Sequence, residues 1–307
     1  SILDLKNFAY LSGFEVVKSG TKMIMPVYIP ILSYFLNRFV ANIWPFSHLG
    51  LFHYVVARIS EARIIDHKPS ISIIVPARNE AGTIEKIVKG LPELGSFTEI
   101  IFVEGNSTDN TFAEIQRVTN LLGSSRKIKF IKQTGKGKGD AVRKGFEIAT
   151  GDILAIYDAD MTVPTNEVKK FYDAIVENKG DFINGSRLVY PMRKESMRVM
   201  NFFGNKFFNL AFSWILGQLL KDTLCGTKML WRTDYSKIKK GRTFFGDFDP
   251  FGDFDLLFGA AKLNLKIIDL PVHYRERVYG ATNISRWKHG WLLLKMTIFA
   301  IRKMKFI

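Results

Sequence analysis

The sequence predicts an α/β protein with a doubly wound, mainly parallel sheet. From Ser70 onwards, short apolar runs alternate with helical segments of about a dozen residues, the pattern of parallel β-α-β units. We expect strands at 71–75, 99–104, 127–131 and 153–157 and helices at 80–91, 109–118 and 140–149. Each expected strand also leads into a cluster of polar residues, and in such sheets ligands bind at the carboxyl ends of the strands.

Size and composition narrow the class of protein. With 307 residues, of which 47% are hydrophobic, the chain can bury a full core as one large domain or one domain with an appendage. The net charge of +15 favours a polyanionic partner such as nucleic acid, an anionic membrane or a phosphorylated substrate. The single cysteine, Cys225, excludes an internal disulfide and fits a small buried side chain in a reducing compartment. The five histidines lack the spacing of zinc ligands.

Residues 1–68 do not follow the pattern of the expected main domain, 69–286. The segments 14–17 and 22–26 look like a strand pair around 18–21, and 53–59 looks like a further strand. This pattern resembles the last strands of a class I methyltransferase domain, without the glycine-rich cofactor loop of that fold. The resemblance implies a methyltransferase-like remnant that cannot bind S-adenosylmethionine. An unrelated N-terminal extension is the alternative.

The most informative polar cluster follows the apolar run 153–157. Asp158 and Asp160 emerge at the carboxyl end of this expected strand, with one residue between them. Two carboxylates in that place suit a divalent cation that bridges a diphosphate, because Mg²⁺ and Mn²⁺ prefer oxygen ligands. Taken alone, however, such a pair is more often a solvated turn at the end of a strand.

Three more clusters, at 76–80, 104–110 and 135–140, follow the other expected strands. Singly, each has a structural explanation: Asn79 and Asp109 as helix caps, the glycines as a turn, the lysines as a solvated patch. Because the carboxyl ends of parallel strands share one edge of the sheet, four successive clusters must converge there. Together with the two aspartates they predict a nucleotide site.

With these motifs the chain resembles the family 2 glycosyltransferases of the GT-A fold, and among them the polyprenyl-phosphate (dolichol-phosphate) sugar transferases. The motifs are V-P-A-R-N-E at 75–80, V-E-G-N-S-T-D at 103–109, the glycine-rich segment 137–151, D-A-D at 158–160, N-G-S-R at 184–187 and R-V-Y-G at 277–280. The resemblance implies a Rossmann-like mixed sheet with helices on both faces, a nucleotide-sugar-dependent hexosyltransferase, and a Mg²⁺ or Mn²⁺ cofactor.

The resemblance also implies roles for individual residues. Asp158 and Asp160 would hold the cation, which stabilises the charge on the departing nucleoside diphosphate. Glu104 would accept hydrogen bonds from the base or ribose, while the lysines of the glycine-rich loop would neutralise the diphosphate or remain solvated. The residues expected to contact the nucleotide are Pro76, Ala77, Glu80, Glu104, Lys136, Lys138, Asp140 and Asp158.

The chain departs from the family pattern at two positions. Glu104-Gly105 stands where the family has paired acids, which alters or removes one contact with the base. Thr162 stands where the polyprenyl-phosphate enzymes often have Gln, two residues after the second acid. A hydroxyl can still complete a metal shell through water, so cation binding is expected to survive.

The acceptor side allows two hypotheses. A lipid phosphate, with a second pKa of about 6, is largely deprotonated at neutral pH and needs no strong base. Arg187, with Arg275 or Arg277, would then bind that phosphate. A hydroxyl acceptor needs a base instead, and Asp253 and Asp255 lie at about the place of the base in the family, although they fit a structural loop equally well.

Two segments have the pattern of amphipathic helices at a membrane surface. In 197–220, polar residues recur every three or four positions and leave a broad apolar face. In 287–307, Lys288, Lys295 and Arg302 recur every seven positions, and we expect the other face to carry Trp291, Leu294, Ile298 and Ile301. Burial against the sheet is the alternative, above all for the first segment. No signal peptide is visible, and no run reaches 18 apolar residues.

These observations predict a metal-dependent, inverting transferase that moves a sugar from a nucleotide-sugar to a polyprenyl phosphate. We expect it to be cytoplasmic and peripheral on the inner face of the cell membrane, bound to an anionic surface, with no nucleic acid partner. The oligomeric state stays open. The alternatives are transfer to a soluble glycan or other hydroxyl, a nucleotidyltransferase that releases pyrophosphate, and a non-enzymatic basic membrane-binding module.

Overall fold

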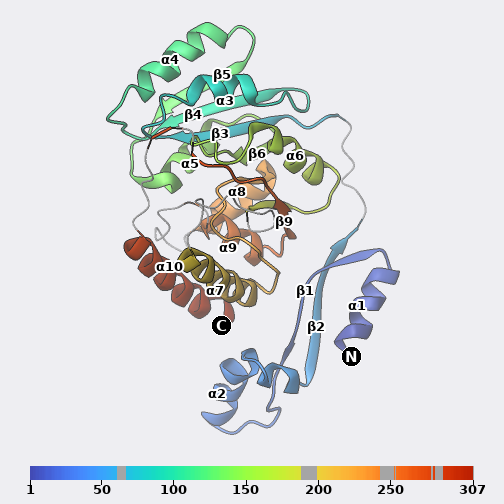
Figure 1. Ribbon diagram of the computed structural model, residues 1–307. Coiled ribbons are helices and arrows are strands. Elements are labelled where there is room, and N and C mark those ends of the chain that lie inside the picture. The colour runs from blue at the N-terminus through green and yellow to red at the C-terminus, as the bar shows by residue number, and fades with distance from the viewer. Residues whose placement is uncertain are drawn as a thin grey trace.

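The computed structural model of the protein describes residues 1–60, 67–187, 199–242, 252, 254–277, 279–280 and 286–306. It arranges them as a large α/β body and a smaller N-terminal unit that projects from it (Figure 1). The two parts have separate sheets, one of seven strands and one of two, counted over the described residues.

The main sheet has the strand order β5-β4-β3-β6-β8-β7-β9. Its strands are β3 (Ile71–Ala77), β4 (Thr98–Glu104), β5 (Lys127–Lys132), β6 (Ile153–Ile156), β7 (Phe182–Ser186), β8 (Lys228–Trp231) and β9 (Ile267–Pro271). Among the described pairs, β8 lies antiparallel to both of its neighbours and the other pairs are parallel. The mixed Rossmann-like sheet that the sequence predicts is therefore confirmed.

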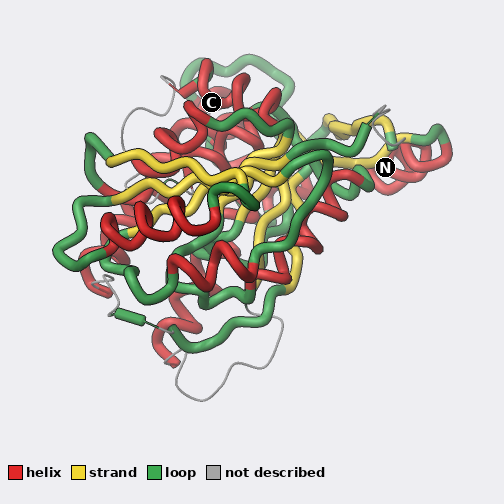
Figure 2. Tube along the Cα trace, turned by 90° about the horizontal axis from the view of Figure 1, so that it is seen from above, coloured by secondary structure: helices red, strands yellow, loops and turns green. Residues whose placement is uncertain are grey.

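Helices cover both faces of this sheet (Figure 2). The strand residues alternate between two cores, so that Ile73 packs in one and Ile74 in the other. The first core includes helices α3 (Ile84–Gly90), α4 (Thr111–Leu122) and α6 (Val168–Val176). The second includes α5 (Gly137–Ile148), α7 (Val199–Leu216), α8 (Arg232–Lys240), α9 (Phe254–Lys262) and α10 (Arg286–Ala300), which continues as a π-helix, η5 (Ile301–Lys305). The strands and helices expected between 71 and 157 are confirmed, with shifted ends.

The N-terminal unit is a long hairpin with helices at both ends. It contains α1 (Ile2–Leu11), β1 (Phe14–Lys22), α2 (Leu32–Arg38), the short helices η1 (Val40–Asn42) and η2 (Phe46–Leu49), and β2 (Phe52–Ile59). The expected strand at 53–59 is confirmed, but the strand pair around 18–21 is wrong, because β1 runs straight through these residues and pairs with β2. Gly20 lets the strand stay extended there: a Cβ would lie 2.8 Å from the hydroxyl of Tyr54 on the paired strand. The methyltransferase resemblance stays a prediction.

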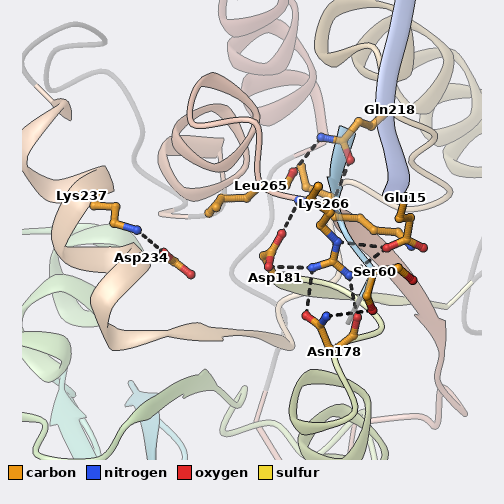
Figure 3. Close-up of polar contacts among 11 residues, drawn as sticks. Glu15, Ser60, Asn178, Asp181, Gln218, Asp234, Lys237, Leu265 and Lys266 are labelled. Carbon is orange, nitrogen blue, oxygen red and sulfur yellow. Dashed lines mark hydrogen bonds and ion pairs between the residues drawn. The ribbon is translucent and has the colours of Figure 1, made fainter. Parts of the chain in front are cut away.

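A network of charged side chains fixes the base of the hairpin to the edge of the main sheet (Figure 3). Arg58 on β2 donates to Glu15 on β1 at 3.0 Å and to Asp181, just before β7, at 2.8 Å. Lys266, just before β9, forms an ion pair with Glu15, and its backbone N–H donates to Asp181 at 2.8 Å. Burial alone would raise the pKa of Glu15, but hydrogen bonds from Lys266 and Arg58 lower it below its usual range. The network therefore holds both hairpin strands in place.

Candidate active site

The loops after β3 and β4 lie against each other at the carboxyl edge of the sheet. The amide of Gly105 donates to the carbonyl of Ala77 at 2.9 Å, and the side-chain oxygen of Asn79 accepts from the amide of Thr108 at 2.8 Å. Glu104 is buried at the end of β4, where its carboxylate accepts from the amide of Ser107 at 2.6 Å. The structure thus brings together the first two polar clusters, with Pro76 beside Ala77 at the end of β3.

Glu80 is a buried acid at this edge with one oxygen unused. Its Oε1 forms an ion pair with Arg277, whereas its buried Oε2 has no hydrogen-bond partner among the described residues. Tyr279 lies over the same loop, so close that a Cβ on Gly82 would be 2.4 Å from its ring. Residues 277, 279 and 280 therefore form a strap over the β3–α3 loop. An unpaired buried carboxylate oxygen beneath it fits a hydrogen-bond donor from a ligand.

The first turn of α5, which follows the glycine-rich loop, brings a lysine to the acidic pair. Lys138 Nζ lies 2.5 Å from Asp158 Oδ1, while Lys136 is exposed at the start of the helix. Asp140 accepts from the amide of Gly135 at 2.9 Å and so closes the loop on itself. The backbone of Gly226 lies close to the ion pair of Asp158 and Lys138. A Cβ on Gly226 would lie 1.9 Å from Asp158 Oδ2 and 2.4 Å from Lys138 Nζ. A larger residue would fit there only if the side chains of Asp158 and Lys138 moved.

Asp158 and Asp160 follow β6, and their pKa values shift in opposite directions. Burial alone would raise the pKa of Asp158, but the nearby charge and hydrogen bond of Lys138 bring it below its usual range. Burial and the charge of Asp158 raise the pKa of Asp160. Thr162 donates to Asp160 Oδ1 from its amide at 3.1 Å and its hydroxyl at 2.9 Å. The hydroxyl at this position, where the family often has Gln, thus orients the second acid.

The two acids fit a divalent cation of the Mg²⁺ or Mn²⁺ type. Both offer oxygen ligands, and the described residues contain no cluster of three or more His, Cys, Asp or Glu side chains that would suit a structural zinc. A site with two protein carboxylates leaves the remaining positions to water and phosphate oxygens, which is how proteins usually hold Mg²⁺.

Arg187 is held by an acid that the sequence did not reveal. At the end of β7 its Nε and Nη2 donate to the two carboxylate oxygens of Asp222 at 2.7 and 2.9 Å. The ring of Tyr274 lies 5.4 Å from the guanidinium carbon. The sole signal in the sequence is the polar turn 222–227 before a short apolar run. Cys225 in this turn is buried, which raises its pKa to about 11, so the expectation of an inert thiol fits its surroundings.

The other candidate acceptor residues are separated by the fold. Arg275 is exposed, and its amide donates to the carbonyl of Thr162 at 2.8 Å, which places it near the acidic pair. Arg277 is engaged with Glu80. Asp255, at the start of α9, lies 3.7 Å from Arg143 and 3.2 Å from Arg242, so that its charge is balanced. Asp253 lies outside the described residues.

The two amphipathic segments differ from the expected patterns. In α7 the polar Asn209 is buried and accepts from the amide of Thr223 at 3.2 Å, while Phe207 and Leu210 are exposed. In α10 the expectation that Trp291 and Ile298 face away from the cations is wrong. The buried face of α10 consists of Leu293, Met296, Thr297 and Ala300. The exposed face carries Trp291, Lys295, Ile298 and Arg302, which lie three to four residues apart and therefore on one side of the helix.

Among the described residues, no helix has both the length and the hydropathy needed to cross a membrane. The apolar side chains of α7 and α10 divide instead between the second core and the surface.

Comparison with known proteins defines the family. Residues 72–239, more than half of the chain, match the family described as glycosyl transferase family 2, and the chain belongs to this enzyme family. The glycosyltransferase AglJ of Haloferax volcanii is 28% identical over 227 residues, which cover 73% of this chain and 69% of that protein. A dolichol-phosphate mannosyltransferase of Pyrococcus furiosus is 34% identical over 122 residues, or 39% of this chain and 33% of that enzyme. The predicted family is confirmed.

Solved structures show the same fold. A glucosyl-3-phosphoglycerate synthase from Mycobacterium tuberculosis, crystallised with Mn²⁺, uridine diphosphate and glucosyl-3-phosphoglycerate, aligns with a TM-score of 0.55 at 18% identity. The alignment covers 77% of this chain and 80% of that chain. The chain is a glycosyltransferase with the GT-A architecture, as the motifs predicted.

Proposed function

We propose that the protein transfers one sugar from a nucleoside-diphosphate sugar to a polyprenyl phosphate, with Mg²⁺ or Mn²⁺, at the inner face of the cell membrane. The observation that carries this proposal is the meeting of Asp158, Asp160 and Lys138 at the end of β6, near the cluster that contains the unpaired oxygen of Glu80. The similarity to dolichol-phosphate mannosyltransferases of Pyrococcus furiosus and Saccharomyces cerevisiae supports the lipid acceptor.

The donor would bind across the ends of β3, β4 and β6. Glu80 Oε2 would accept a hydrogen bond from the base or ribose. Lys138 would move away from Asp158 and bind the diphosphate. Asp158 and Asp160 would hold the divalent ion, which supplies charge stabilisation for the leaving nucleoside diphosphate. Gly226 keeps this edge open, since a larger residue would collide with the acid and the lysine.

The acceptor phosphate would be ionised before it reacts. An oxygen of the phosphate attacks the anomeric carbon as the bond from that carbon to the diphosphate breaks, which inverts the configuration and requires no protein base. Arg275, which is exposed and whose backbone amide bonds to Thr162, would attract this phosphate. Arg187 acts as a positioning residue, because Asp222 already occupies the Nε–Nη2 edge of its guanidinium.

A soluble hydroxyl acceptor is the second candidate. The structural similarity to a synthase crystallised with glucosyl-3-phosphoglycerate favours it, but that likeness rests on the fold. Such a reaction needs a base, and Asp255 is paired with Arg143 and Arg242 in the present arrangement. Direct comparison of acceptors decides between the two candidates.

The test has a binding stage and a transfer stage. Each nucleoside diphosphate should raise the thermal midpoint only with Mn²⁺ or Mg²⁺ present, and chelator should cancel the effect, because ligand binding stabilises the folded state by mass action. Asp160→Asn should remove this metal dependence, while Asp173→Asn, at a partly exposed acid on α6 that pairs with Lys169, should not. The preferred nucleotide-sugar should then label a short polyprenyl phosphate in detergent. Equal nucleotide binding with and without chelator would contradict the cation site, and labelling of soluble glycans alone would contradict the acceptor.

A further inference from the structure

The segment between β1 and β2, residues 23–51, leaves most of its large apolar side chains exposed in the part of the chain that the structure describes. We call it the hairpin tip. Of its 29 residues, 19 are hydrophobic and Arg38 is the only charged one. The structure describes the whole segment, and within it Ser33 and Ala41 alone are buried. The exposed large side chains are Val27, Tyr28, Ile29, Ile31, Leu32, Tyr34, Phe35, Ile43, Trp44, Phe46, Leu49 and Leu51. A contiguous apolar surface of this kind usually marks an interaction site.

The surroundings of the hairpin tip are basic. Residues 16–60 contain four Lys and Arg and no Asp or Glu, and residues 286–306 contain six and none. Lys18 and Lys22 on β1 come close to Lys305 of η5: burial and the charges of these two lysines lower the pKa of Lys305. Three like charges held together in acid-free segments favour an anionic partner.

The hairpin tip is held in a defined position. The rings of Phe39 and Phe306 lie 5.2 Å apart, and Trp214 on α7 donates from its indole N–H to the carbonyl of Asn42 at 2.9 Å. Lys305 lies over the ring of Trp214 at 5.2 Å. At its other end the hairpin is fixed by the Arg58 network (Figure 3). The exposed apolar side chains therefore project from a supported surface that adjoins the cationic end of α10.

We infer that the hairpin tip inserts into the interface of an anionic lipid bilayer, with Lys18, Lys22 and Lys305 against the lipid phosphates. Exposed Trp and Tyr, here Trp44 and Tyr28, are the side chains that favour the headgroup level, because one end is apolar and the other polar. A second copy of the chain fits less well, since a symmetric contact would bring two acid-free cationic surfaces together. The inference deepens the proposed function and rests on it for its purpose, but its test does not require transfer.

Vesicle flotation of the full chain tests the insertion. Tyr28→Ser, Ile31→Ser and Trp44→Ser, combined in one variant, replace side chains that are 82%, 85% and 74% exposed, so the fold should persist. Binding to vesicles with about 30% anionic lipid should fall at least about tenfold, because three apolar insertions are lost. The matched control is Leu121→Ser, an exposed leucine on α4, which should float like the parent.

A second variant tests the charges. Lys18→Gln with Lys22→Gln should reduce the preference for anionic over neutral vesicles by about tenfold or more, since each cation near such a surface contributes about 1 kcal/mol. Lys89→Gln, an exposed lysine on α3, is the control. Brominated lipids should quench tryptophan fluorescence, and Trp44→Phe should reduce the quenching while binding persists.

Three results would overturn the inference. The first is that the parent protein fails to float with either kind of vesicle. The second is that the triple variant floats as well as the parent. The third is that light scattering shows a dimer for the parent and a monomer for the triple variant. Thermal shifts with the preferred nucleoside diphosphate, measured on the same samples, separate this inference from the proposed function. A triple variant that binds nucleotide and labels a detergent-solubilised acceptor normally, but does not float, supports insertion alone.

Discussion

The main sheet and the hairpin tip are similarly apolar, yet one is a core and the other a surface. Every residue of β4 is buried, whereas the hairpin tip buries two small residues in its whole length. The difference lies in the neighbouring chain. Each strand of the first half of the sheet is followed by a helix that covers it, while the hairpin tip contacts the main body through Phe39 and Asn42 and leaves most of its large apolar side chains exposed. Apolar sequence predicts burial only where the adjoining chain supplies a second layer.

The largest expected effect comes from one methyl group added beside Asp158 and Asp160, at the carboxyl edge of the buried sheet. Gly226→Ala places a Cβ against Asp158 and Lys138, so both must move, and we expect sugar transfer to fall about 10³-fold, as when a preorganised charged group is misplaced. Steady-state transfer rates and nucleotide affinity measure the loss. Gly204→Ala in α7, where a Cβ meets no atom within 4 Å, is the control. Activity within tenfold of the parent would mean that the loop 222–227 does not support the site.

The next test breaks the join between the two regions. Arg58→Ala leaves Glu15 and Asp181 without their shared cation, and the side chain of Arg58 is 14% exposed. The free energy of unfolding should fall by about 2 kcal/mol, less than on removing one partner of a fully buried pair, because these groups are partly exposed. Urea denaturation measures it. Arg117→Ala, an exposed ion-paired control, should cost less than about 1 kcal/mol. Equal effects in the two variants would show that the network does not anchor the hairpin.

What the sequence could predict was local. The strands and helices between 71 and 157 follow from patterns within one β-α-β unit, and the clusters at their ends converge because parallel topology requires it. The pair Arg187–Asp222 is different: it joins residues 35 positions apart, and nothing in the spacing marks Asp222 as the partner. The strand at 18–21 was mistaken for a turn because its pairing partner lies more than thirty residues later.

Surface direction was also hard to predict. Seven-residue spacing of cations in 287–307 suggested a purely basic face, but packing against the second core decides which residues of α10 are left outside. The polar Asn209 is buried although the pattern suggested an exposed face, because its side-chain oxygen accepts a hydrogen bond from a backbone amide in the loop that follows α7. Both cases depend on tertiary contacts that a periodicity does not contain.

Charge provides a finer comparison, since the hairpin tip has no acid whereas β9 of the main sheet carries a partly buried one, Asp269. Burial raises the pKa of Asp269 to about 6. The folded state therefore holds this proton more tightly than the unfolded chain, and the stabilisation is full below pH 3.8 and lost as pH rises through 6. The loss should reach about 2 to 3 kcal/mol.

Asp269→Asn tests this assignment because an amide cannot titrate. The difference in unfolding free energy between parent and variant should decline with pH across that window, whatever the constant offset from altered hydrogen bonds to Asn184 and Lys221. Urea denaturation at several pH values gives the curve. A difference that does not change with pH would show that Asp269 titrates at its ordinary value.

The smallest expected effect asks whether the exposed face of α10 shares the lipid contact with the hairpin tip. Trp291 is 61% exposed, and Lys295 lies over its ring at 5.8 Å, so both would reach the headgroup region at the margin of the contact. Trp291→Ala with Lys295→Gln should weaken vesicle binding by about fivefold, or about 1 kcal/mol, since one interfacial cation and one partly exposed ring are lost. The same flotation assay measures it. A loss larger than that of the triple variant in the hairpin tip would make α10 the main lipid contact. The hairpin tip would then not be the element that inserts most deeply into the bilayer.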